Sequence, residues 1–405
     1  MRIMLVDVNY GTSSTGKIVA DLFKRLKQLG HEVLVCYGRG PISEDAGVNK
    51  FSGTIEFLIH ASLSRVIGLN GMFSPIATYR LKRKVDKFKP DVVHLHDLHG
   101  FFINYFSFLD FLKEKKIPVV WTFHSEFMIT GNCGATNGCQ KWRVNCESCP
   151  QKSTFPETWI FDFSKYLFFK KKRLFQNQST ISITTPSSWL THNVAASPML
   201  KKDTIIKTVQ NGVDCDIFNI GASQEFPSIR SRDDEFIVIA VGANLMSSAK
   251  GGSFVLDLAA RLPDITFLLV GAAEDVNRLP PNVTSFGDIS DKAYLANLYD
   301  QSNLTLVVSK SESFSMVCAE SLACGTPVAG FKGGGPEEVA PQGYGYFVEY
   351  GDRDALELGI KRIRSGEEAL QSSIACNAYA KQKYGLKIMT ERFLHSYEEA
   401  ISHYE

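Results

Sequence analysis

No window of this 405-residue sequence offers the roughly 20 uninterrupted apolar residues that a membrane-spanning helix needs. The sequence also has no internal repeat and no low-complexity segment. The apolar run at its start, Met1 to Val8, is too short for a signal peptide and predicts a buried first strand instead. We therefore expect a globular protein of the cytoplasm, long enough for two domains that each bury a core.

A large net charge is absent too, because 44 Lys and Arg nearly balance 43 Asp and Glu. Residues 1–218, however, carry 28 cationic and 18 acidic side chains, a net of +10, which leaves −9 for residues 219–405. The first half is therefore expected to meet something anionic. In Tyr166–Phe175, four consecutive cations lie among aromatic residues, which is typical of a helix on an anionic membrane surface; a solvated helix face is the alternative. No nucleic-acid-binding motif accompanies the charge, so nucleic acid is not expected as a partner.

Strand-like apolar runs alternate with helical segments along the whole chain, and this pattern predicts a doubly wound α/β architecture. In the first half, strands are expected at 2–8, 32–37, 91–95, 117–123, 180–185 and 204–209, and helices at 16–29, 54–68, 77–88, 101–114, 163–176 and 187–195. In the second half, strands are expected at 235–242 and near 265–270, 282–286, 303–308 and 326–330.

A polar stretch rich in Ser, Pro and Asp, Gly221–Asp234, interrupts this alternation. We therefore expect a first domain at 1–218, a linker at 219–234, a second domain at 235–385 and a final helix at 386–405.

The most informative segment is Glu312-Ser-Phe-Ser-Met-Val-Cys-Ala-Glu320, in which two glutamates flank the junction between a predicted loop and a predicted helix. A strand-like run precedes it, and Gly325 and Pro327 follow where a helix would stop. Unpaired N–H groups at a helix N-terminus bind anions, so a diphosphate would fit there, with a carboxylate on either side to hold hydroxyl-bearing groups. For an isolated pair of this kind, an ordinary helix with two acidic residues is the alternative.

With its flanking Gly-x-Pro, this segment resembles the donor-sugar site of retaining nucleotide-sugar glycosyltransferases with the GT-B fold, of the family 4 type. The resemblance covers nearly the whole chain and is closest to enzymes that build bacterial exopolysaccharide or O-antigen. It implies an α/β GT-B fold, in which two Rossmann-like domains face each other across a cleft and the final helix packs back on the first domain. It also implies transfer of a hexosyl residue from a UDP- or GDP-sugar to a lipid-linked saccharide acceptor, with peripheral contact with the inner membrane. No catalytic cofactor is expected.

The resemblance assigns roles to the residues of this segment. Glu320 is expected to hold the ribose hydroxyls of the nucleotide, and Glu312 to orient the donor sugar as a catalytic residue. The turn Ser285–Ile289 matches the segment that meets the nucleotide base, which makes Ile289 a donor-binding candidate. The diphosphate is expected to accept hydrogen bonds from the backbone N–H groups of Phe314, Ser315, Met316 and Val317.

The segment Val241–Gly252 resembles the part of these enzymes where an Arg and a Lys clamp the donor diphosphate. Lys250, followed by two glycines, matches the Lys, but Ala243 or Asn244 stands where the Arg is expected. Neutralisation of the leaving group is therefore expected to depend on Lys250 and a helix dipole.

Three histidines end the segment Asp91-Val-Val-His-Leu-His-Asp-Leu-His99. Strand alternation places His94 and His96 on the same side, with His96 at the carboxyl end of the predicted strand. The resemblance assigns His96 to the donor sugar or its phosphate as a second catalytic residue, with His99 as a further ligand contact. His124 ends the next predicted strand and is expected to line the same region. A structural histidine is the alternative for each of them.

The segment Gly11-Thr-Ser-Ser-Thr-Gly-Lys17 matches the first seven positions of a P-loop between a strand and a helix. Ile18 stands where the magnesium-binding Ser or Thr is required, which argues against a P-loop NTPase. The resemblance offers another interpretation, in which this loop lets the backbone approach donor and acceptor closely. Gly16 is then a donor-binding residue, and Lys17 lies near the phosphates or faces solvent.

Four of the nine cysteines, Cys133, Cys139, Cys146 and Cys149, fall within one loop, 133–149. Disulfides are rare in the cytoplasm, and four thiolates in a short loop are compatible with tetrahedral zinc. Such a zinc would be structural, since no open coordination position is implied. Loose or redox-active thiols are the alternative.

Two alternatives to a glycosyltransferase stay open. A nucleotide-sugar epimerase of the same fold would release free nucleotide without an acceptor, and a P-loop NTPase would require magnesium and Lys17.

Overall fold

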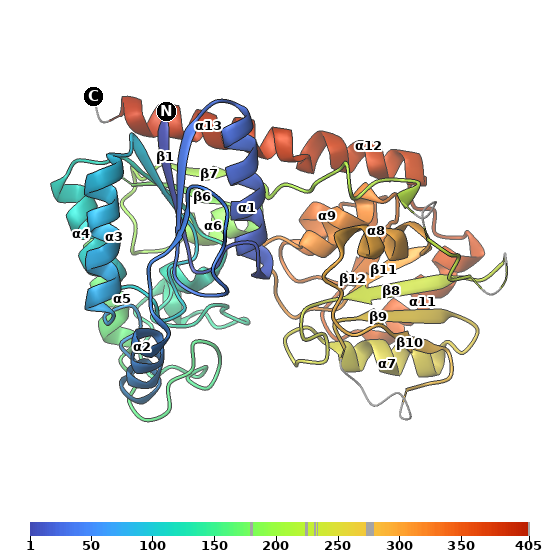
Figure 1. The fold of residues 1–405 in the computed structure, drawn as a ribbon. Coiled ribbons are helices and arrows are strands. Elements are labelled where there is room, and N and C mark those ends of the chain that lie inside the picture. The colour runs from blue at the N-terminus through green and yellow to red at the C-terminus, as the bar shows by residue number, and fades with distance from the viewer. Residues whose placement is uncertain (179–180, 223–225, 231, 233, 273–278, 404–405) are drawn as a thin grey trace. The chain divides into compact units, whose positions relative to one another are not determined.

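The computed structural model describes residues 1–178, 181–222, 226–230, 232, 234–272 and 279–403 (Figure 1). They form two compact units, which we call the first domain (Met1–Gln210 with Met389–Glu405) and the second domain (Asn211–Ile388). Residues 223–225, 231 and 233 of the predicted linker lie outside the described residues, and the remainder of that segment belongs to the second domain. Residue 180 of a predicted strand and residues 404–405 of the predicted final helix also lie outside them.

The first domain is built on a sheet of parallel strands in the order β3-β2-β1-β4-β5-β6-β7. The strands are β1 (Arg2–Asp7), β2 (Glu32–Tyr37), β3 (Val48–Lys50), β4 (Val92–Leu95), β5 (Val119–Thr122), β6 (Ile181–Thr185) and β7 (Ile206–Thr208). The helices are α1 (Ser13–Gln28), α2 (Thr54–Ile67), α3 (Pro75–Phe88), α4 (Tyr105–Glu114), α5 (Ser164–Asn177), α6 (Ser188–Ala195) and α13 (Leu386–Ser402), with two short 3-10 helices at Glu126–Ile129 and Lys141–Arg143. Val93 and Leu95 share one core with α3, α4 and α5, so strand alternation turns His94 to the opposite face of the sheet.

The second domain repeats this plan with a sheet of parallel strands in the order β10-β9-β8-β11-β12-β13. The strands are β8 (Ile237–Val241), β9 (Thr266–Val270), β10 (Val283–Ser285), β11 (Leu304–Val307), β12 (Val328–Phe331) and β13 (Gly345–Val348). The helices are α7 (Gly252–Arg261), α8 (Lys292–Asp300), α9 (Met316–Ala323), α10 (Pro336–Val339), α11 (Arg353–Ser365) and α12 (Ser373–Tyr384). Separate cores lie on the two faces of the sheet. Within the described part of the chain, no helix combines the length and apolar content that a membrane span requires.

The predicted doubly wound α/β architecture is confirmed, because each domain is a parallel sheet covered by helices. The sequence pattern fails at one edge strand of each sheet. Neither β3 nor β13 is predicted, because Val48–Lys50 contains one apolar residue and Gly345–Val348 begins with glycine. Helix α4 begins at Tyr105 rather than at 101, because Phe101 has a φ of +67° and the Asn104 side chain caps the helix.

The final helix, α13, packs on the first domain on the face of the sheet to which His94 turns. Phe393 and Tyr397 are fully buried there, and Tyr397 Oη lies 2.7 Å from His94 Nδ1. The Phe393 ring lies 4.7 Å from the His94 ring, centroid to centroid. An ion pair between Lys207 and Glu399 adds a contact between β7 and this helix. The final helix is thus held against β4 and β7 of the first domain.

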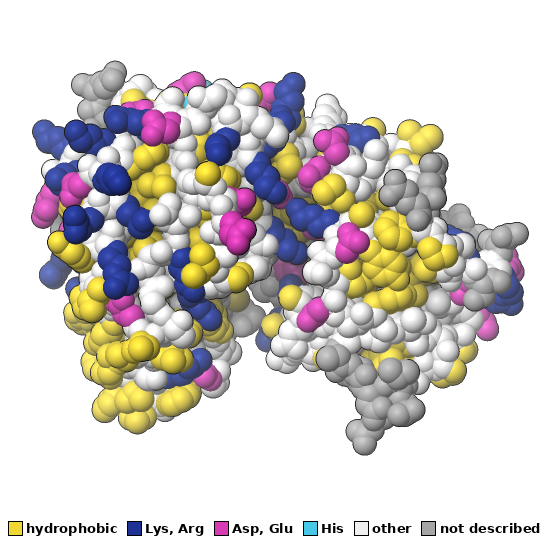
Figure 2. All heavy atoms as spheres, viewed as in Figure 1, with side chains coloured by type: hydrophobic (Ala, Val, Ile, Leu, Met, Phe, Trp, Pro, Cys, Tyr) yellow, Lys and Arg dark blue, Asp and Glu magenta, His cyan; other side chains and the backbone are white. Residues whose placement is uncertain are grey.

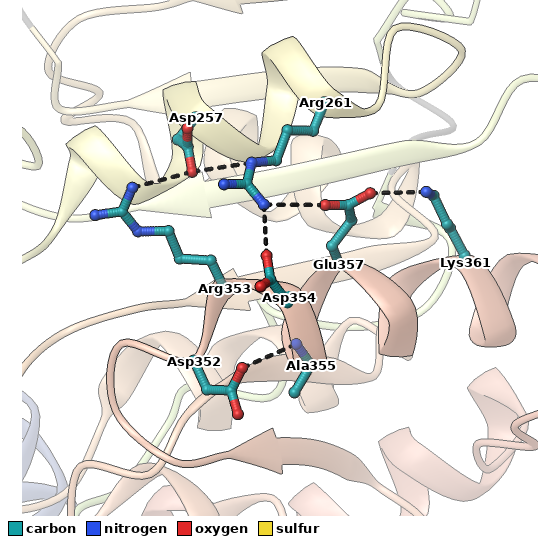
Figure 3. Close-up of polar contacts among 8 residues, drawn as sticks. All are labelled: Asp257, Arg261, Asp352, Arg353, Asp354, Ala355, Glu357 and Lys361. Carbon is teal, nitrogen blue, oxygen red and sulfur yellow. Dashed lines mark hydrogen bonds and ion pairs between the residues drawn. The ribbon is translucent and has the colours of Figure 1, made fainter.

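In the second domain, a network of ion pairs joins α7 to α11 (Figure 3). Arg261 contacts Asp354 at 2.8 Å and Glu357 at 3.3 Å, and Arg353 contacts Asp257 at 3.3 Å. Exposed pairs of this kind contribute about 0–1 kcal/mol each, so we infer that the network mainly fixes how the two helices lie against each other. Both helices pack on the same core, beside the strands that carry the candidate site.

We expect Phe393→Ala to lower the free energy of unfolding of the first domain by about 3–5 kcal/mol, because it leaves a cavity beside His94. Glu398→Ala, at an exposed position of the same helix, should change it by less than about 0.5 kcal/mol. Urea unfolding followed by far-UV circular dichroism measures both, and equal effects of the two substitutions would contradict the packing role of α13.

Candidate functional site

Each sheet has one position where the order of its strands reverses. In the first domain β1 lies between β2 and β4, and in the second domain β8 lies between β9 and β11. The loops that follow two such strands run to opposite sides of the sheet, which opens a crevice at their carboxyl ends. Asp7 is the last residue of β1 and His96 follows β4, whereas Lys250 and Glu312 follow β8 and β11. The predicted catalytic residues therefore all lie at these two reversal points, each within its own domain.

In the second domain, the structure brings Lys250 and Glu312 into direct contact. Lys250 Nζ lies 2.6 Å from Glu312 Oε1, and Ser309 Oγ donates a hydrogen bond of 2.7 Å to the same oxygen. Burial alone would raise the pKa of Glu312, but the charge of Lys250 and hydrogen bonds from Lys250, Ser309 and Ser315 hold it below its usual value. Glu312 is thus a carboxylate at neutral pH, able to accept hydrogen bonds from sugar hydroxyls. The Lys250 side chain is 35% exposed, so its ammonium can still meet an anion.

Helix α9 begins at Met316, shortly after Glu312, and its N-terminus offers hydrogen-bond donors to an anion. Ser315 caps the helix by accepting a hydrogen bond from the N–H of Cys318, and its φ of +146° is in the region that favours glycine. Strained residues of this kind cluster at ligand sites. Outside the helices and strands of the described part of the chain, the N–H groups of Phe314, Ser315, Met316 and Val317 donate no hydrogen bond to a backbone carbonyl. With the helix dipole, these donors make an anion site.

Glu320 lies one turn further along α9, where the buried Tyr299 of α8 donates a hydrogen bond of 3.4 Å to Glu320 Oε2. Burial first, and then the carboxylate of Glu320, raises the pKa of Tyr299 well above its usual value, so this hydroxyl stays a donor. Ile289 lies on a different loop, after β10, and is half-buried. That loop is tied to the end of β9 through a hydrogen bond of 2.6 Å from Gly271 N to Gly287 O.

The loop that follows β12 packs closely against the backbone of the loop that follows β11. A side chain at Gly335 would meet the backbone N and O of Phe314 at 2.5 Å, and Gly335 N donates to the carbonyl of Glu312 at 2.8 Å. The Glu337 carboxylate accepts hydrogen bonds from the N–H groups of Gly333 and Gly334. The loop that follows β12 thus supports the backbone of Glu312 from one side. We infer that Glu337 is a positioning residue. The Gly-Pro-Glu motif is visible in the sequence, but the hydrogen bonds of Glu337 to the glycine N–H groups are not.

In the first domain, the structure brings His94, His96 and His124 together. The rings of His94 and His96 lie 4.0 Å apart, so the prediction that they share one side is confirmed. His94 is held between Tyr397 and Thr122, at 2.7 Å each, and is a structural residue. His96 Nδ1 lies 3.0 Å from His124 Nε2.

The environment of His96 keeps it neutral. Burial, and then its histidine neighbours, lower the pKa of His96 well below its usual value, and burial lowers that of His124 to about 3. His96 Nε2 has no hydrogen-bond partner in the described part of the chain and borders a cavity of about 10 Å³, barely enough for one water molecule. His96 can therefore form a hydrogen bond with a ligand, but as a neutral imidazole it supplies no positive charge.

Two carboxyl groups that the sequence reasoning missed lie beside these histidines. Asp97 N donates a hydrogen bond of 3.1 Å to Asp7 Oδ1, and Asp97 Oδ1 lies 3.5 Å from His99 Nδ1. Burial, and then repulsion from Asp97, raises the pKa of Asp7 well above its usual value, while burial raises that of Asp97 to about 7. Burial thus favours the protonated form of both carboxyl groups relative to an exposed aspartate. In the sequence, each of Asp7 and Asp97 comes at the end of an apolar strand, which is a signal that could have drawn attention to them. Only the pairing of β1 with β4 makes them neighbours.

Of the other predicted contacts, His99 lines the same cavity as His96 and His124, whereas Gly16 and Lys17 lie on α1. The His99 ring stacks on Phe127 at 5.0 Å, and burial lowers the pKa of His99 to about 4. Gly16 lies inside α1, close to the backbone of Asn9, and Lys17 is exposed on the same helix. The place of Lys17 near the donor phosphates stays a prediction.

The loop 133–149 is held by hydrogen bonds. Gly131 N donates to Cys146 Sγ at 3.2 Å, and Cys149 N donates to an Asp162 carboxylate oxygen at 2.7 Å. Cys133 and Cys146 are buried, Cys139 and Cys149 are half-buried, and all four are free thiols. Among the residues that the structure describes, no three His, Cys, Asp or Glu side chains are arranged to hold a metal ion.

The predicted interfacial run Tyr166–Phe175 forms most of α5, but one of its four consecutive cations does not face solvent. Lys171 is fully buried, and its ammonium donates hydrogen bonds to the carbonyls of Phe127 (2.5 Å) and Thr130 (3.1 Å). The helical period turns this one cation inward, and contact of the run with a membrane stays a prediction. Tyr166, Phe169 and Arg173 are exposed.

Two family models match the chain. The model described as Glycosyltransferase Family 4 matches residues 15–217, and the model described as Glycosyl transferases group 1 matches residues 222–383. Among related proteins, WcaC of Escherichia coli (strain K12) is 24% identical over 375 residues, which cover 88% of this chain and 89% of that protein. Its name refers to glycosyl transfer in colanic acid biosynthesis.

Solved structures of similar fold cover nearly the whole chain. Sucrose-phosphate synthase of Thermosynechococcus elongatus has a TM-score of 0.72 at 18% identity over 99% of both chains. HepE of Anabaena, solved in complex with UDP, has a TM-score of 0.67 at 16% identity over 98% of this chain and 100% of that chain. These likenesses confirm the predicted GT-B fold.

Asp97 gives the first domain a predicted dependence on pH. Its pKa is about 7 in the folded protein and near 3.8 in an unfolded chain, so between these values the folded state binds the extra proton. Stability from this group is therefore present below about pH 4 and is lost as the pH rises towards 7. Relative to the wild type, the free energy of unfolding of Asp97→Asn should rise by on the order of 2 kcal/mol as the pH increases from 4 to 7. This is less than the full difference in pKa would give, because the Asp97 side chain is 16% exposed to solvent.

The measurement is urea unfolding at a series of pH values. Asp110→Asn, at an exposed acid of the same domain, should follow the wild type at every pH. An Asp97→Asn curve parallel to that of the wild type would contradict the buried proton.

Proposed function

The chain belongs to glycosyltransferase family 4 and is a glycosyltransferase, and we propose that it transfers a hexosyl residue, with retention of configuration, from a nucleotide-diphosphate sugar to a lipid-linked saccharide. The proposed process is the synthesis of a bacterial surface polysaccharide. The similarity to WcaC, whose name refers to colanic acid biosynthesis, supports this process. The likeness to HepE, solved with UDP, supports a nucleotide sugar as donor.

The observation that carries the proposal is the contact between Lys250 and Glu312 beside the start of α9. A cation, an ionised carboxylate and unpaired N–H groups lie together at the reversal point of the second sheet. A sugar diphosphate needs this combination, because its phosphates require positive charge and donors while its hydroxyls require an acceptor.

In the proposed reaction, the bond between the anomeric carbon and the diphosphate oxygen breaks, and the acceptor hydroxyl forms its new bond on the same face of the sugar. The hydroxyl proton passes to the departing diphosphate, so no strong protein base is required. Lys250 and the N–H groups of Phe314 to Val317 stabilise the negative charge as it develops on the diphosphate. Glu312 orients the donor sugar, and Glu320, held by Tyr299, accepts hydrogen bonds from the ribose. The anomeric configuration of the product, read by NMR, decides between retention and inversion.

His96 is proposed to contact the donor sugar as a neutral hydrogen-bonding group. Its Nδ1 is engaged by His124 and its Nε2 is the atom that has no described partner. Because its pKa is lowered well below the usual value, the cationic part of the proposed chemistry is assigned to Lys250 rather than to this imidazole.

A lipid-linked acceptor and a peripheral position on the inner membrane complete the proposal. The net charge of +10 in residues 1–218 supports contact with an anionic surface. The structural zinc predicted at Cys133, Cys139, Cys146 and Cys149 stays a prediction, which elemental analysis of the purified protein decides.

A thermal-shift screen of UDP-, GDP- and ADP-sugars tests the donor site. We expect one nucleotide class to raise the melting temperature, with the same shift in EDTA, and we expect Glu320→Ala to lose it because the ribose loses its acceptor. Glu367→Ala, at an exposed acid of the same domain, should keep the shift. Stabilisation by ATP with magnesium alone would overturn the proposal, and an altered free sugar released without an acceptor would indicate an epimerase.

Lys250→Met should lower kcat by about 100-fold with the donor that this screen identifies, because it removes the cation that faces the leaving diphosphate. Steady-state kinetics with saturating donor measures the change. Lys383→Met, at an exposed position of α12, is the matched control and should retain wild-type kcat. An unchanged kcat in Lys250→Met would show that another group neutralises the leaving group.

A further inference from the structure

Helix α2 carries its large aliphatic side chains on the outside. Ile55, Leu58, Ile59 and Leu63 are 76%, 55%, 56% and 36% exposed, and their spacing places them on one face of the helix. The residues of α2 that are buried are His60, Ala61 and Ser64. A helix on the surface of a globular protein normally has the reverse arrangement, with its apolar stripe against the core.

Polar contacts hold α2 in this orientation. His60 Nδ1 lies 2.8 Å from Ser74 Oγ, and His60 Nε2 accepts a hydrogen bond from Gly71 N. The Glu56 carboxylate accepts a hydrogen bond of 2.9 Å from Ala77 N in the first turn of α3. The inner face of α2 is thus fixed by its polar groups, and the aliphatic face is left to solvent.

A second exposed apolar segment lies against the end of α2. Trp159 N donates a hydrogen bond of 2.6 Å to the carbonyl of Arg65, and Phe161 N donates one of 3.4 Å to the carbonyl of Val66. Trp159, Ile160 and Phe161 are 60%, 59% and 52% exposed. Backbone pairing therefore makes these side chains and the aliphatic face of α2 parts of one surface.

Aromatic contacts extend this surface to α5. The Phe163 ring lies 6.2 Å from that of Phe161 and 6.4 Å from that of Tyr166, and Phe169 is exposed one turn further on. We call the exposed apolar residues of α2, of segment 159–163 and of the start of α5 the α2–α5 surface. Figure 2 shows hydrophobic side chains gathered at the end of the first domain that carries α2. Exposed apolar patches of this extent on soluble proteins mark interaction sites.

The charges around the α2–α5 surface favour an anionic partner. Lys165 of α5 pairs with Glu147 at 2.7 Å, and the Arg65 guanidinium lies 5.9 Å from the Trp159 ring. The positive charge that remains comes from Arg173, exposed on α5, and from the net charge of +10 of residues 1–218. The acids nearby are engaged: Glu157 pairs with Arg65, and the Asp162 carboxylate accepts hydrogen bonds from the N–H groups of Cys149 and Ser164.

We infer that the α2–α5 surface docks on an anionic lipid bilayer, with the aliphatic face of α2 and the aromatic rings entering the headgroup region and the flanking cations meeting lipid phosphates. A second copy of this chain would bring the same positive charges to the surface, whereas an anionic bilayer offers both an apolar layer and negative charge. Tryptophan and tyrosine suit the boundary between headgroups and acyl chains. The inference rests on the proposed function for its purpose, since docking would bring the enzyme to a lipid-linked acceptor.

The test is sedimentation of the full chain with phosphatidylcholine vesicles that contain about 30% phosphatidylglycerol, and with phosphatidylcholine vesicles alone. We expect binding to the anionic vesicles that weakens with salt. A double variant, Leu58→Gln with Ile59→Gln, should bind at least about 10-fold more weakly, because two exposed aliphatic side chains no longer enter the bilayer. The matched control is Leu358→Gln with Ile374→Gln, which changes one Leu and one Ile of similar exposure in the second domain and should bind as the wild type does.

Absence of binding to anionic vesicles, or equal weakening in the two double variants, would overturn the inference. So would a dimer in vesicle-free solution that the α2 double variant converts to monomer, because the surface would then be a protein interface. The thermal shift with nucleotide sugars, measured without vesicles, should be unchanged in both double variants. Vesicle binding without any nucleotide-sugar response would instead refute the proposed function and leave the docking surface standing.

Discussion

In a parallel sheet every strand ends at the same edge, so the loops that follow the strands meet there whatever their separation in the sequence. The chain uses this constraint twice. Lys250 and Glu312 are far apart in the sequence, yet they are 2.6 Å apart because β8 and β11 are neighbours. Asp7 and Asp97 become partners in the same way, because β1 pairs with β4. The chemistry of both domains depends on this pairing.

The two reversal points have opposite electrostatic character. In the second domain a carboxylate is kept ionised by an adjacent cation, and donors at the start of α9 extend the region that can accept a diphosphate. In the first domain burial keeps the imidazoles of His96 and His124 neutral and raises the pKa of both Asp7 and Asp97. The reversal point of the second domain is therefore suited to binding a negatively charged group, and that of the first domain to forming hydrogen bonds with a neutral one. This division agrees with a nucleotide sugar whose diphosphate is bound by the second domain.

The α2–α5 surface and the buried Lys171 both follow from how helical periodicity distributes residues. In α5 the period turns one cation of a basic run inward, where backbone carbonyls receive it. In α2 the period puts four aliphatic side chains outward, because polar residues of the same helix are needed to hold the neighbouring loop. The composition of α2 and α5 does not tell which of their side chains are exposed, because exposure depends on the face of the helix that each residue occupies.

The sequence by itself determined the alternation of strands and helices, the placement of Glu312 and Glu320 around a helix start, and the location of His96 at a strand end. These are local properties, set by apolar periodicity and by capping residues within a few positions of each other. Tertiary structure decided which of these local features meet. It paired Lys250 with Glu312, placed Tyr299 against Glu320 and brought Asp7 beside Asp97. The physical reason is that strand order in a sheet is fixed by packing between distant segments, which no short window of sequence contains.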